Sequence, residues 1–329
     1  MTKLRSAAIT GLLLAGVLAA CAAPEEEAPA CDRACLIDLT ERYVAGIEGN
    51  SVEGLPFSDE VVIVENLQRI RAGEGLWADT TGKGTDFSVI VPDEANQTAG
   101  WLGMVERDGK PAVVAVRLKL DPEGSIVEAE HLHAEITNES QLANLQTVRP
   151  GLLAEVPEAN RLGRDELIRI GESYYDALDD NNGTLTPFAE DCQRHENGMV
   201  TAGANAGAGP NNNTAPVARD CAGQLTAGVF TYIATIDNRR VFAADPLTGL
   251  VMGLSHFRHP MDFEPYEVTA LDGSKIMYDK SRLPFEPFDL PAAHIYKVGA
   301  DGKVHEIEAM GFRADLNSPS GWENTVAAK

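Results

Sequence analysis

Basic residues are scarce in this sequence of 329 residues: 27 Lys and Arg stand against 50 Asp and Glu, which gives a net charge of −23. A surface of that sign repels polyphosphates and anionic headgroups, so nucleic acid and anionic lipid are excluded as electrostatic partners. Long apolar runs are missing too. The apolar run at residues 7–20 is shorter than the roughly 20 residues that a membrane-spanning helix needs.

The signatures of common catalytic folds are also missing. No nucleophile elbow, phosphate-binding glycine loop, dinucleotide fingerprint or zinc-ligand spacing occurs. The glycines of "GEGLW" (residues 73–77) and "GANAGAG" (residues 203–209) do not lie between a strand and a helix at the required spacing. Ser-His-Asp hydrolases and nicotinamide enzymes are therefore disfavoured, and we expect neither a cofactor nor a metal.

The N-terminus carries an export signal. Lys3 and Arg5 precede the apolar run, which ends in "LAAC" at residues 18–21 and resembles the lipobox of bacterial lipoproteins. The resemblance implies cleavage before Cys21, lipidation of that cysteine and, because alanine follows it, the outer membrane. We therefore expect a signal peptide at 1–20 and a flexible, lipidated tether at 21–30, with the protein anchored in the cell envelope and facing the periplasm. The alternative is an ordinary signal peptide with a chance cysteine.

Only four further cysteines occur, at positions 31, 35, 192 and 221. In an exported protein an even number of cysteines indicates disulfides, and four cysteines allow three pairings. Cys31 and Cys35 are close in sequence, so the expected pairs are Cys31–Cys35 and Cys192–Cys221. The second pair would staple a loop rich in Gly, Asn and Ala. A metal site is the competing interpretation, and no CxxC or paired-histidine spacing supports it.

An internal repeat organises the chain. Residues 36–66 align without a gap with residues 167–197, a shift of 131 (167 minus 36). Each copy opens with apolar positions spaced three and four apart, which predicts amphipathic helices at 33–49 and 164–180. Both copies close with a strand–turn–strand pattern, at 116–132 and 294–310, a shift of 178 (294 minus 116). The middle of the second copy is therefore longer by about 47 residues (178 minus 131), as expected for loop insertions.

A helix followed by a curved, mostly antiparallel sheet predicts an α+β fold with two tandem domains, at 31–150 and 160–325. The pattern resembles the NTF2/SnoaL-like superfamily, whose cone-shaped domains wrap a bent sheet around a long helix and leave an internal pocket. It is most similar to a two-copy bacterial and fungal group of uncharacterised domains. The segments that carry this likeness are "CDRACL" (31–36), "GEGLW" (73–77), "CQRHENG" (192–198), "CAGQLTAGVFTYI" (221–233) and "SPSGW" (318–322).

The superfamily likeness implies acid–base chemistry inside an apolar cone, which needs a histidine or carboxylate with a shifted pKa. The second copy is richer in ionisable groups: His195 aligns with Val64, and His294 with Val116. The shared Glu65 and Glu196 suit a structural role, such as capping a loop. We therefore expect the catalytic residues among His195, His294, His256 and Glu308.

The last strand of each copy carries two glutamates on one face, Glu128 and Glu130 in the first copy and Glu306 and Glu308 in the second. Glutamates on an edge strand usually face water. If they face inward, they need basic partners, for which Arg117 and Arg240 are candidates. Aromatic residues gather in the second copy, and the residues expected to bind substrate are Tyr232, Arg240, Phe257 and Tyr296.

Two functions fit these patterns. The first is a cofactor-independent lyase or isomerase acting on a small apolar or aromatic ligand. A few envelope-attached members of the superfamily are β-etherases that cleave lignin-derived dimers as paired related subunits, and the chain is similar to them in outline. This likeness implies β-aryl ether cleavage and a homodimer or a heterodimer with a related subunit. The second function is a non-catalytic lipoprotein that binds a ligand or scaffolds a partner.

Overall fold

The fold is that of a computed structural model that describes residues 31–203, 206 and 217–323. The expected signal peptide, the tether with Cys21 and residues 204, 205 and 207–216 of the loop rich in Gly, Asn and Ala lie outside these residues. In the part of the chain that is described, no helix has the length and apolar character to span a membrane.

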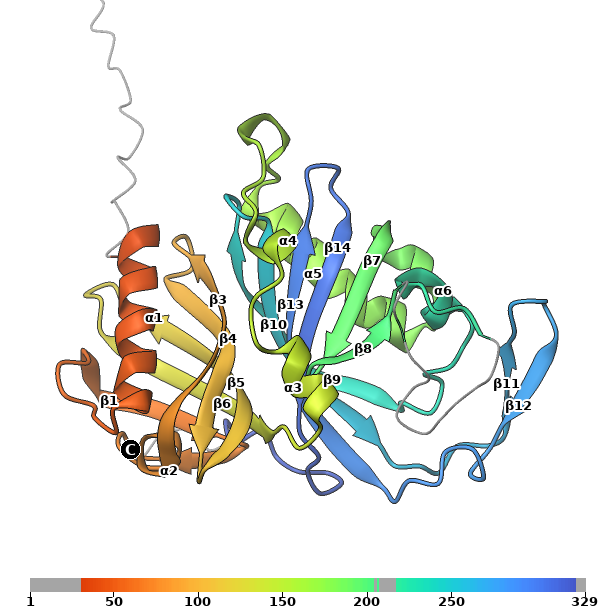
Figure 1. Cartoon of the computed structure of the whole chain (residues 1–329), viewed down its shortest axis with the longest axis horizontal. Coiled ribbons are helices and arrows are strands. Elements are labelled where there is room, and N and C mark those ends of the chain that lie inside the picture. Colours follow the sequence, from red (N-terminus) through yellow and green to blue (C-terminus); the bar gives the residue numbers. More distant parts are fainter. Residues whose placement is uncertain (1–30, 204–205, 207–216, 324–329) are drawn as a thin grey trace, which may run out of the picture.

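The first domain consists of one long helix and a six-stranded sheet (Figure 1). The strands lie in the order β2-β1-β6-β5-β4-β3, and all pairs are antiparallel except β1 and β6. The elements are α1 (Arg33–Glu48), β1 (Phe57–Glu65), β2 (Gln68–Ile70), α2 (Leu76–Asp79), β3 (Thr80–Asp93), β4 (Thr98–Arg107), β5 (Lys110–Leu120) and β6 (Ile126–Glu135).

The second domain repeats this plan with the strand order β8-β7-β14-β13-β10-β9. An extra hairpin of β11 and β12 is inserted between β10 and β13, where the sequence predicted added length. The elements are α5 (Arg164–Asp179), η2 (Gly183–Leu185), β7 (Phe188–Glu196), β8 (Met199–Ala202), α6 (Cys221–Thr226), β9 (Thr235–Asp245), β10 (Leu250–His259), β11 (Tyr266–Thr269), β12 (Lys275–Tyr278), β13 (Phe288–Val298) and β14 (Val304–Gly311). Short helices connect the domains: α3 (Glu139–Asn144), α4 (Pro150–Leu153) and η1 (Glu158–Asn160). The prediction of two α+β sheet domains is confirmed.

The two long helices form where the apolar spacing predicts them. In each, the predicted stripe of apolar side chains is buried against the sheet, from Leu36 to Ile47 in α1 and from Leu167 to Leu178 in α5. The Asp32 side chain caps α1 by accepting a hydrogen bond from the amide of Cys35. Both predicted disulfides, Cys31–Cys35 and Cys192–Cys221, are present.

The repeated Glu-Asn pair ends an equivalent strand in both domains. Asn66 and Asn197 have positive φ angles of 41° and 47°, which asparagine tolerates better than most residues. The Asn66 side chain bonds the backbone of His133, and the Asn197 side chain bonds the backbone of Gly311. The asparagine of the repeated pair therefore holds the end of the closing strand in both copies.

The two sheets pack against each other through the faces that α1 and α5 do not cover. One apolar cluster contains residues of both domains, including Leu102 and Met104 from the first and Met252 and Leu254 from the second. Here the face of each sheet that is covered by its long helix is called the inner face, and the other is called the outer face. Each sheet is therefore buried on both faces, one inside its own domain and one between the domains.

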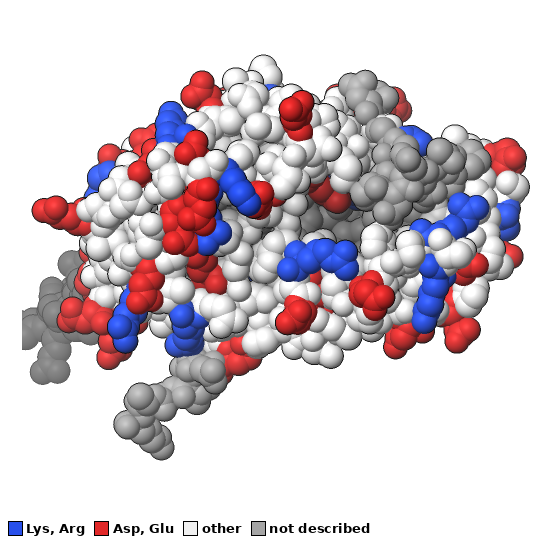
Figure 2. Space-filling view, turned by 60° about the horizontal axis from the view of Figure 1, so that its bottom comes forward, with Lys and Arg blue, Asp and Glu red and all other residues white. Residues whose placement is uncertain are grey.

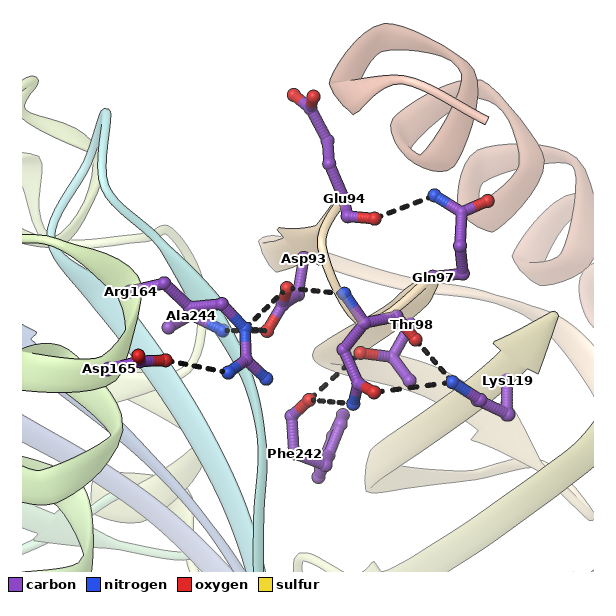
Figure 3. Close-up of polar contacts among 10 residues, drawn as sticks. Asp93, Glu94, Gln97, Thr98, Lys119, Arg164, Asp165, Phe242 and Ala244 are labelled. Atoms are coloured by element: carbon purple, nitrogen blue, oxygen red, sulfur yellow. Dashed lines mark hydrogen bonds and ion pairs between the residues drawn. The ribbon is translucent and has the colours of Figure 1, made fainter. Parts of the chain in front are cut away.

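Reciprocal ion pairs border this contact. Arg33, at the start of α1, pairs with Asp245 of the second domain, and Arg164, at the start of α5, pairs with Asp93 of the first. Both aspartates are nearly fully buried, and Asp93 also accepts a hydrogen bond from the amide of Ala244 (Figure 3). Because equivalent arginines bind equivalent aspartates across the contact, the two copies meet as the halves of a symmetric dimer do.

The C-terminal segment returns to the first domain. Arg69 donates a hydrogen bond from Nε to the carbonyl oxygen of Gly321. Gly321 has a φ of +85°, and a Cβ there would meet Val64 and the backbone of Leu67 at 3.0 Å or less. Only glycine fits this close approach, so "SPSGW" fastens the end of the second domain to the first.

The expectation that the paired glutamates face water is wrong for one glutamate in each copy. The side chains of Glu130 and Glu308 are 3% and 1% exposed, because β6 and β14 are internal strands and their outer faces lie between the domains. The arginines named as partners do bind the glutamates of the first copy, Arg117 to Glu128 and Arg240 of the second domain to Glu130, but they do so on the outer face and not inside the cone. On the surface drawn in Figure 2, acidic and basic side chains lie interspersed.

Candidate functional site

A cavity of about 200 Å³ lies on the inner face of the second sheet, next to α5. Most of its wall is apolar, and a few polar side chains interrupt it. Such a mixture is typical of sites for small organic molecules. The wall comprises Gln141, Tyr174, Leu178, Arg194, Glu196, Asn197, Met199, Phe230, Tyr232, Ile233, Phe257, His259, Leu290, Ala292, His294, Ala309, Met310 and Gly311.

In the first domain, a histidine occupies the equivalent space. His131 is fully buried, and its ring nitrogens contact the Tyr43 hydroxyl at 2.9 Å and the Glu65 carboxylate at 3.0 Å. The Trp77 ring packs edge-on against it, with the ring centroids 5.1 Å apart. The interior of the first domain is thus filled by aromatic and imidazole rings.

The second domain has smaller residues at the positions that fill this space in the first domain. His131 pairs with Glu65 across β6 and β1, and its counterpart across β14 and β7 is Ala309, which pairs with Glu196. Two residues later, His133 is replaced by Gly311, the residue that Asn197 holds. Ala309 and Gly311 both line the cavity. The smaller side chains at these two positions of the closing strand therefore leave space where the two imidazole rings lie in the first domain.

Arg194 places a guanidinium inside the cone, at a position that the repeat aligns with the buried Ile63. Its side chain is 3% exposed, and its Nη1 donates to the Tyr174 hydroxyl at 3.2 Å. Nη2 donates to Gln224 on α6 at 2.7 Å, and Nε lies 3.1 Å from Glu196. The Cys192–Cys221 disulfide joins α6 to β7, the strand that carries Arg194, so it holds Gln224 in place.

Glu196 has a different environment from Glu65, although the repeat aligns them. The Glu65 carboxylate caps α2 by accepting from the amide of Leu76, which confirms the structural role predicted for it. Hydrogen bonds from His131 and His133 outweigh the effect of burial and hold the pKa of Glu65 well below its usual range. Glu196 lines the cavity, is 43% exposed and pairs with Arg194. Glu196 therefore lacks the contacts that give Glu65 its structural role, and a structural role for Glu196 stays a prediction.

Two histidines point into the cavity, and both are neutral at pH 7. Burial, helped by the nearby charge of Arg194, lowers the pKa of His294 to about 3. Burial also lowers the pKa of His259 to about 4, and its ring stacks on Phe288 with the centroids 4.2 Å apart. The His294 Nδ1 lies 3.4 Å from the Tyr175 hydroxyl.

Of the residues predicted for the site, His294, Tyr232 and Phe257 line the cavity. The phenol of Tyr232 keeps its proton, because burial raises its pKa to about 12. Tyr296 lies outside the lining. It is fully buried beside His294, with the two rings parallel and their centroids 6.0 Å apart.

The other predicted residues lie on the outer face of the second sheet, which corrects their expected place in the cone. His195 and Glu308 both contact Arg149, at 3.1 Å and 2.8 Å, in the cluster that joins the linker to β14. Arg240 is engaged with Glu130 between the domains. Side chains alternate along a strand, so the inward position of Arg194 and Glu196 forces His195 outward.

His256 also faces away from the cavity. Its Nε2 lies 3.2 Å from the Ser318 hydroxyl and 3.2 Å from Arg258, whose guanidinium binds the buried Asp289. His256 therefore helps to hold the C-terminal segment. Its neighbour His259, three residues along the same strand, faces the cavity, as alternation predicts.

The buried Glu308 predicts an unusual dependence of stability on pH. Burial raises its pKa from the ordinary 4.5 to about 7, although Arg149 opposes the shift. The folded state therefore favours the protonated carboxyl of Glu308. This contribution to the free energy of unfolding is complete below pH 4.5 and is lost as the pH rises through about 7. We expect Glu308→Gln to gain about 1–3 kcal/mol of unfolding free energy relative to the wild type between pH 5 and 8. Urea denaturation across this range measures it, and parallel pH profiles would contradict the assignment.

Sequence reasoning missed Arg194, Glu196 and His259. The sequence does contain a signal for Arg194, because the repeat aligns it with an isoleucine of the first copy. A charged side chain at an apolar position of the repeat predicts a buried group with polar partners. Glu196 had only half of such a signal: the sequence shows His131 and His133 replaced by Ala309 and Gly311, but the contact of these histidines with Glu65 is visible only in the structure. The spacing of His256 and His259 predicted that they face opposite ways with one of them at the pocket, and the residue chosen, His256, was the wrong one of the two.

Residues 160–311, nearly the whole second domain, match the model of a family described as a domain of unknown function (DUF8021). A comparison with curated proteins finds no match. The chain is thus similar to this family over the part that contains the cavity.

Proposed function

We propose that the second domain binds a small, flat and mostly apolar molecule and transforms it by proton transfer without a cofactor, as a lyase or isomerase of the NTF2/SnoaL-like type. The observation that carries the proposal is the exchange of His131 for Ala309 between the copies. It empties the cone of the second domain while polar groups remain around the space. A buried arginine, a carboxylate and two neutral imidazoles then surround an apolar cavity.

Each polar group has a distinct role in such a reaction. Arg194 and the Tyr174 hydroxyl that it contacts stabilise negative charge on a substrate oxygen, because both are held in place before the reaction begins. Glu196 takes the proton from carbon, and its protonated carboxyl then gives that proton to a neighbouring carbon in an isomerisation or to the departing oxygen in an elimination, which restores the carboxylate. His294 orients the substrate by hydrogen bonding, since an imidazole with a pKa of about 3 is a poor proton acceptor at neutral pH.

The size of the cavity limits the substrate. A cavity of about 150 Å³ holds benzene, so the 200 Å³ here holds one ring with a short substituent. A β-aryl ether dimer would place one of its two rings inside and leave the other at the mouth. Single-ring compounds are therefore the first substrates to test, and lignin-type dimers are the second.

A non-catalytic ligand-binding function is the second candidate. The observation that favours it is the low pKa of both His259 and His294, which makes both imidazoles poor proton acceptors at neutral pH. Among the described residues of the cavity wall, this leaves Glu196 as the candidate base, and its carboxylate is ion-paired with Arg194. If Glu196 served only to pair with Arg194, the cone would bind and release a ligand unchanged.

One experiment separates these functions. The chain from Cys31 onward, which keeps both domains and both disulfides, is incubated with single-ring ketones, phenols and aryl ethers, and products are followed by mass spectrometry. We expect turnover of at least one compound and a loss of about a hundredfold in Glu196→Gln, the size of a general-base contribution. Binding without turnover would support the second function. If no compound of the panel binds and none is turned over, both functions are overturned.

The anchor and the assembly complete the proposal. Lipidation at Cys21 would hold the protein at the outer membrane, facing the periplasm, with residues 22–30 as a spacer. The β-etherase likeness implied paired related subunits. Within this chain, the reciprocal pairs Arg33–Asp245 and Arg164–Asp93 already join two related domains. One chain therefore supplies both related domains of such a pair, and the contact between them forms without a second subunit.

A further inference from the structure

We propose that the cavity selects uncharged single-ring carbonyl compounds and rejects carboxylates and cations of the same shape, because Glu196 neutralises its only cationic side chain in advance. This inference rests on the proposed function and names the substrate class of the same site.

The charges on the cavity wall cancel. Arg194 and Glu196 are the only Lys, Arg, Asp or Glu side chains among the described residues that line it, and they lie 3.1 Å apart. The other contacts of the guanidinium are uncharged: Tyr174 and Gln224 accept its hydrogen bonds, and the Phe230 ring lies 5.1 Å from its centre. A ligand therefore meets a site with no net charge.

A charged ligand loses more in this site than it gains. A carboxylate next to Arg194 would also lie next to Glu196, so two anions would share one guanidinium. A cation next to Glu196 would face Arg194, which is 3% exposed and poorly screened by water. Either ligand would also lose its hydration on entering a wall that is mostly apolar.

An uncharged carbonyl compound fits the remaining hydrogen-bonding groups. Three of the five N–H groups of Arg194 are engaged, by Tyr174, Gln224 and Thr201, which leaves two to donate to a carbonyl oxygen. The rings of Phe230, Phe257 and Tyr232 on the wall suit the flat face of the ligand.

The test uses three ligands of one shape and different charge: acetophenone, benzoate and benzamidinium. Their dissociation constants are measured by ligand-observed NMR on the chain from Cys31 onward. In the wild type, we expect acetophenone to bind at least about tenfold more tightly than either ion, the ratio that 1.4 kcal/mol produces.

Two variants change the charge of the wall in opposite directions. Glu196→Gln leaves Arg194 unpaired and is expected to shift the ratio at least about tenfold toward benzoate. Arg194→Ile, which copies Ile63 of the first domain, leaves Glu196 unpaired and is expected to shift it toward benzamidinium. Each variant is checked for folding by circular dichroism, and either one alone suffices for the test.

The outcomes separate this inference from the proposed function. Tightest binding of benzoate or benzamidinium by the wild type would overturn the charge selection and leave a ligand-binding cavity in place. The charge selection would also be overturned if a folded variant kept the wild-type ratios of the three dissociation constants. If no compound of this trio or of the wider panel binds, the proposed function itself fails.

Discussion

Ala309→His is expected to close the cavity of the second domain and to weaken ligand binding at least about a hundredfold, while the protein stays folded. The first domain carries a histidine at this position of the repeat, where it fills the cone. An imidazole added to a cavity of about 200 Å³ leaves no room for a substituted ring. The loss of binding therefore follows from volume.

The variant should fold because the partners of the new histidine are already present. In the first domain, His131 contacts Tyr43 and Glu65, and the repeat places Tyr174 and Glu196 at the equivalent positions. Larger side chains usually strain a packed core, but this one enters an open space that can satisfy both ring nitrogens.

The measurement is the dissociation constant of the tightest ligand from the panel, together with the melting temperature. Ala309→Ser is the matched control, since it changes polarity at the same position with little added volume, and it should bind within a few-fold of the wild type. A folded Ala309→His protein with unchanged affinity would show that the ligand binds elsewhere.

The sequence predicted most of the architecture because the repeat, the helix periodicity and the cysteines can be read along the chain without knowing how the strands pair. The helices at 33–49 and 164–180 were predicted within one residue at their C-terminal ends. The disulfides followed from the pairing of neighbouring cysteines. Helix periodicity is visible within a few turns of sequence, and the second disulfide follows once Cys31 and Cys35 are paired.

The orientation of the site residues could not be read in the same way. Alternation predicts that His195 and Glu196 face opposite sides of β7, but it does not say which side α5 covers. The burial of Glu308 could not be predicted from the sequence either, because it depends on the order of the strands in the sheet. Its strand is internal because β14 pairs in parallel with β7, a contact between segments more than a hundred residues apart.

The contact between the domains explains why polar residues gather away from the cavity. Both faces of each sheet are buried, so a charged residue in a strand is no indication of a pocket by itself. Arg240 is half-buried and Glu308 is fully buried, and their ion pairs hold the domains and the linker. The repeat was the better guide, because a position that differs between copies with one fold marks a difference in use.

The second large effect is expected in the first domain, where His131→Ala should lower the free energy of unfolding by about 3–5 kcal/mol. The substitution removes a fully buried ring and both of its hydrogen bonds, to the Tyr43 hydroxyl and the Glu65 carboxylate. A buried hydroxyl and a buried carboxylate then lose a partner at once.

The loss should depend on pH in a defined direction. The hydrogen bonds of His131 and His133 hold the pKa of Glu65 below its ordinary 4.5, so Glu65 stabilises the fold above that pH and loses this effect as the pH falls. Weakening these bonds therefore costs most above pH 4.5. Urea denaturation at pH 4 and pH 7 measures the difference, and a larger loss at pH 4 would contradict it.

His133→Ala is the matched control, because His133 is 13% exposed and lies 3.6 Å from Glu65, so its loss should be smaller. Ala309→His provides the opposite test: the residue that stabilises one domain is expected to block the other without unfolding it. If both results hold, one position of the repeat accounts for the difference between a filled cone and an open one. The small side chain at position 309 is then best explained by the ligand that it admits, since a histidine there would give the stronger core.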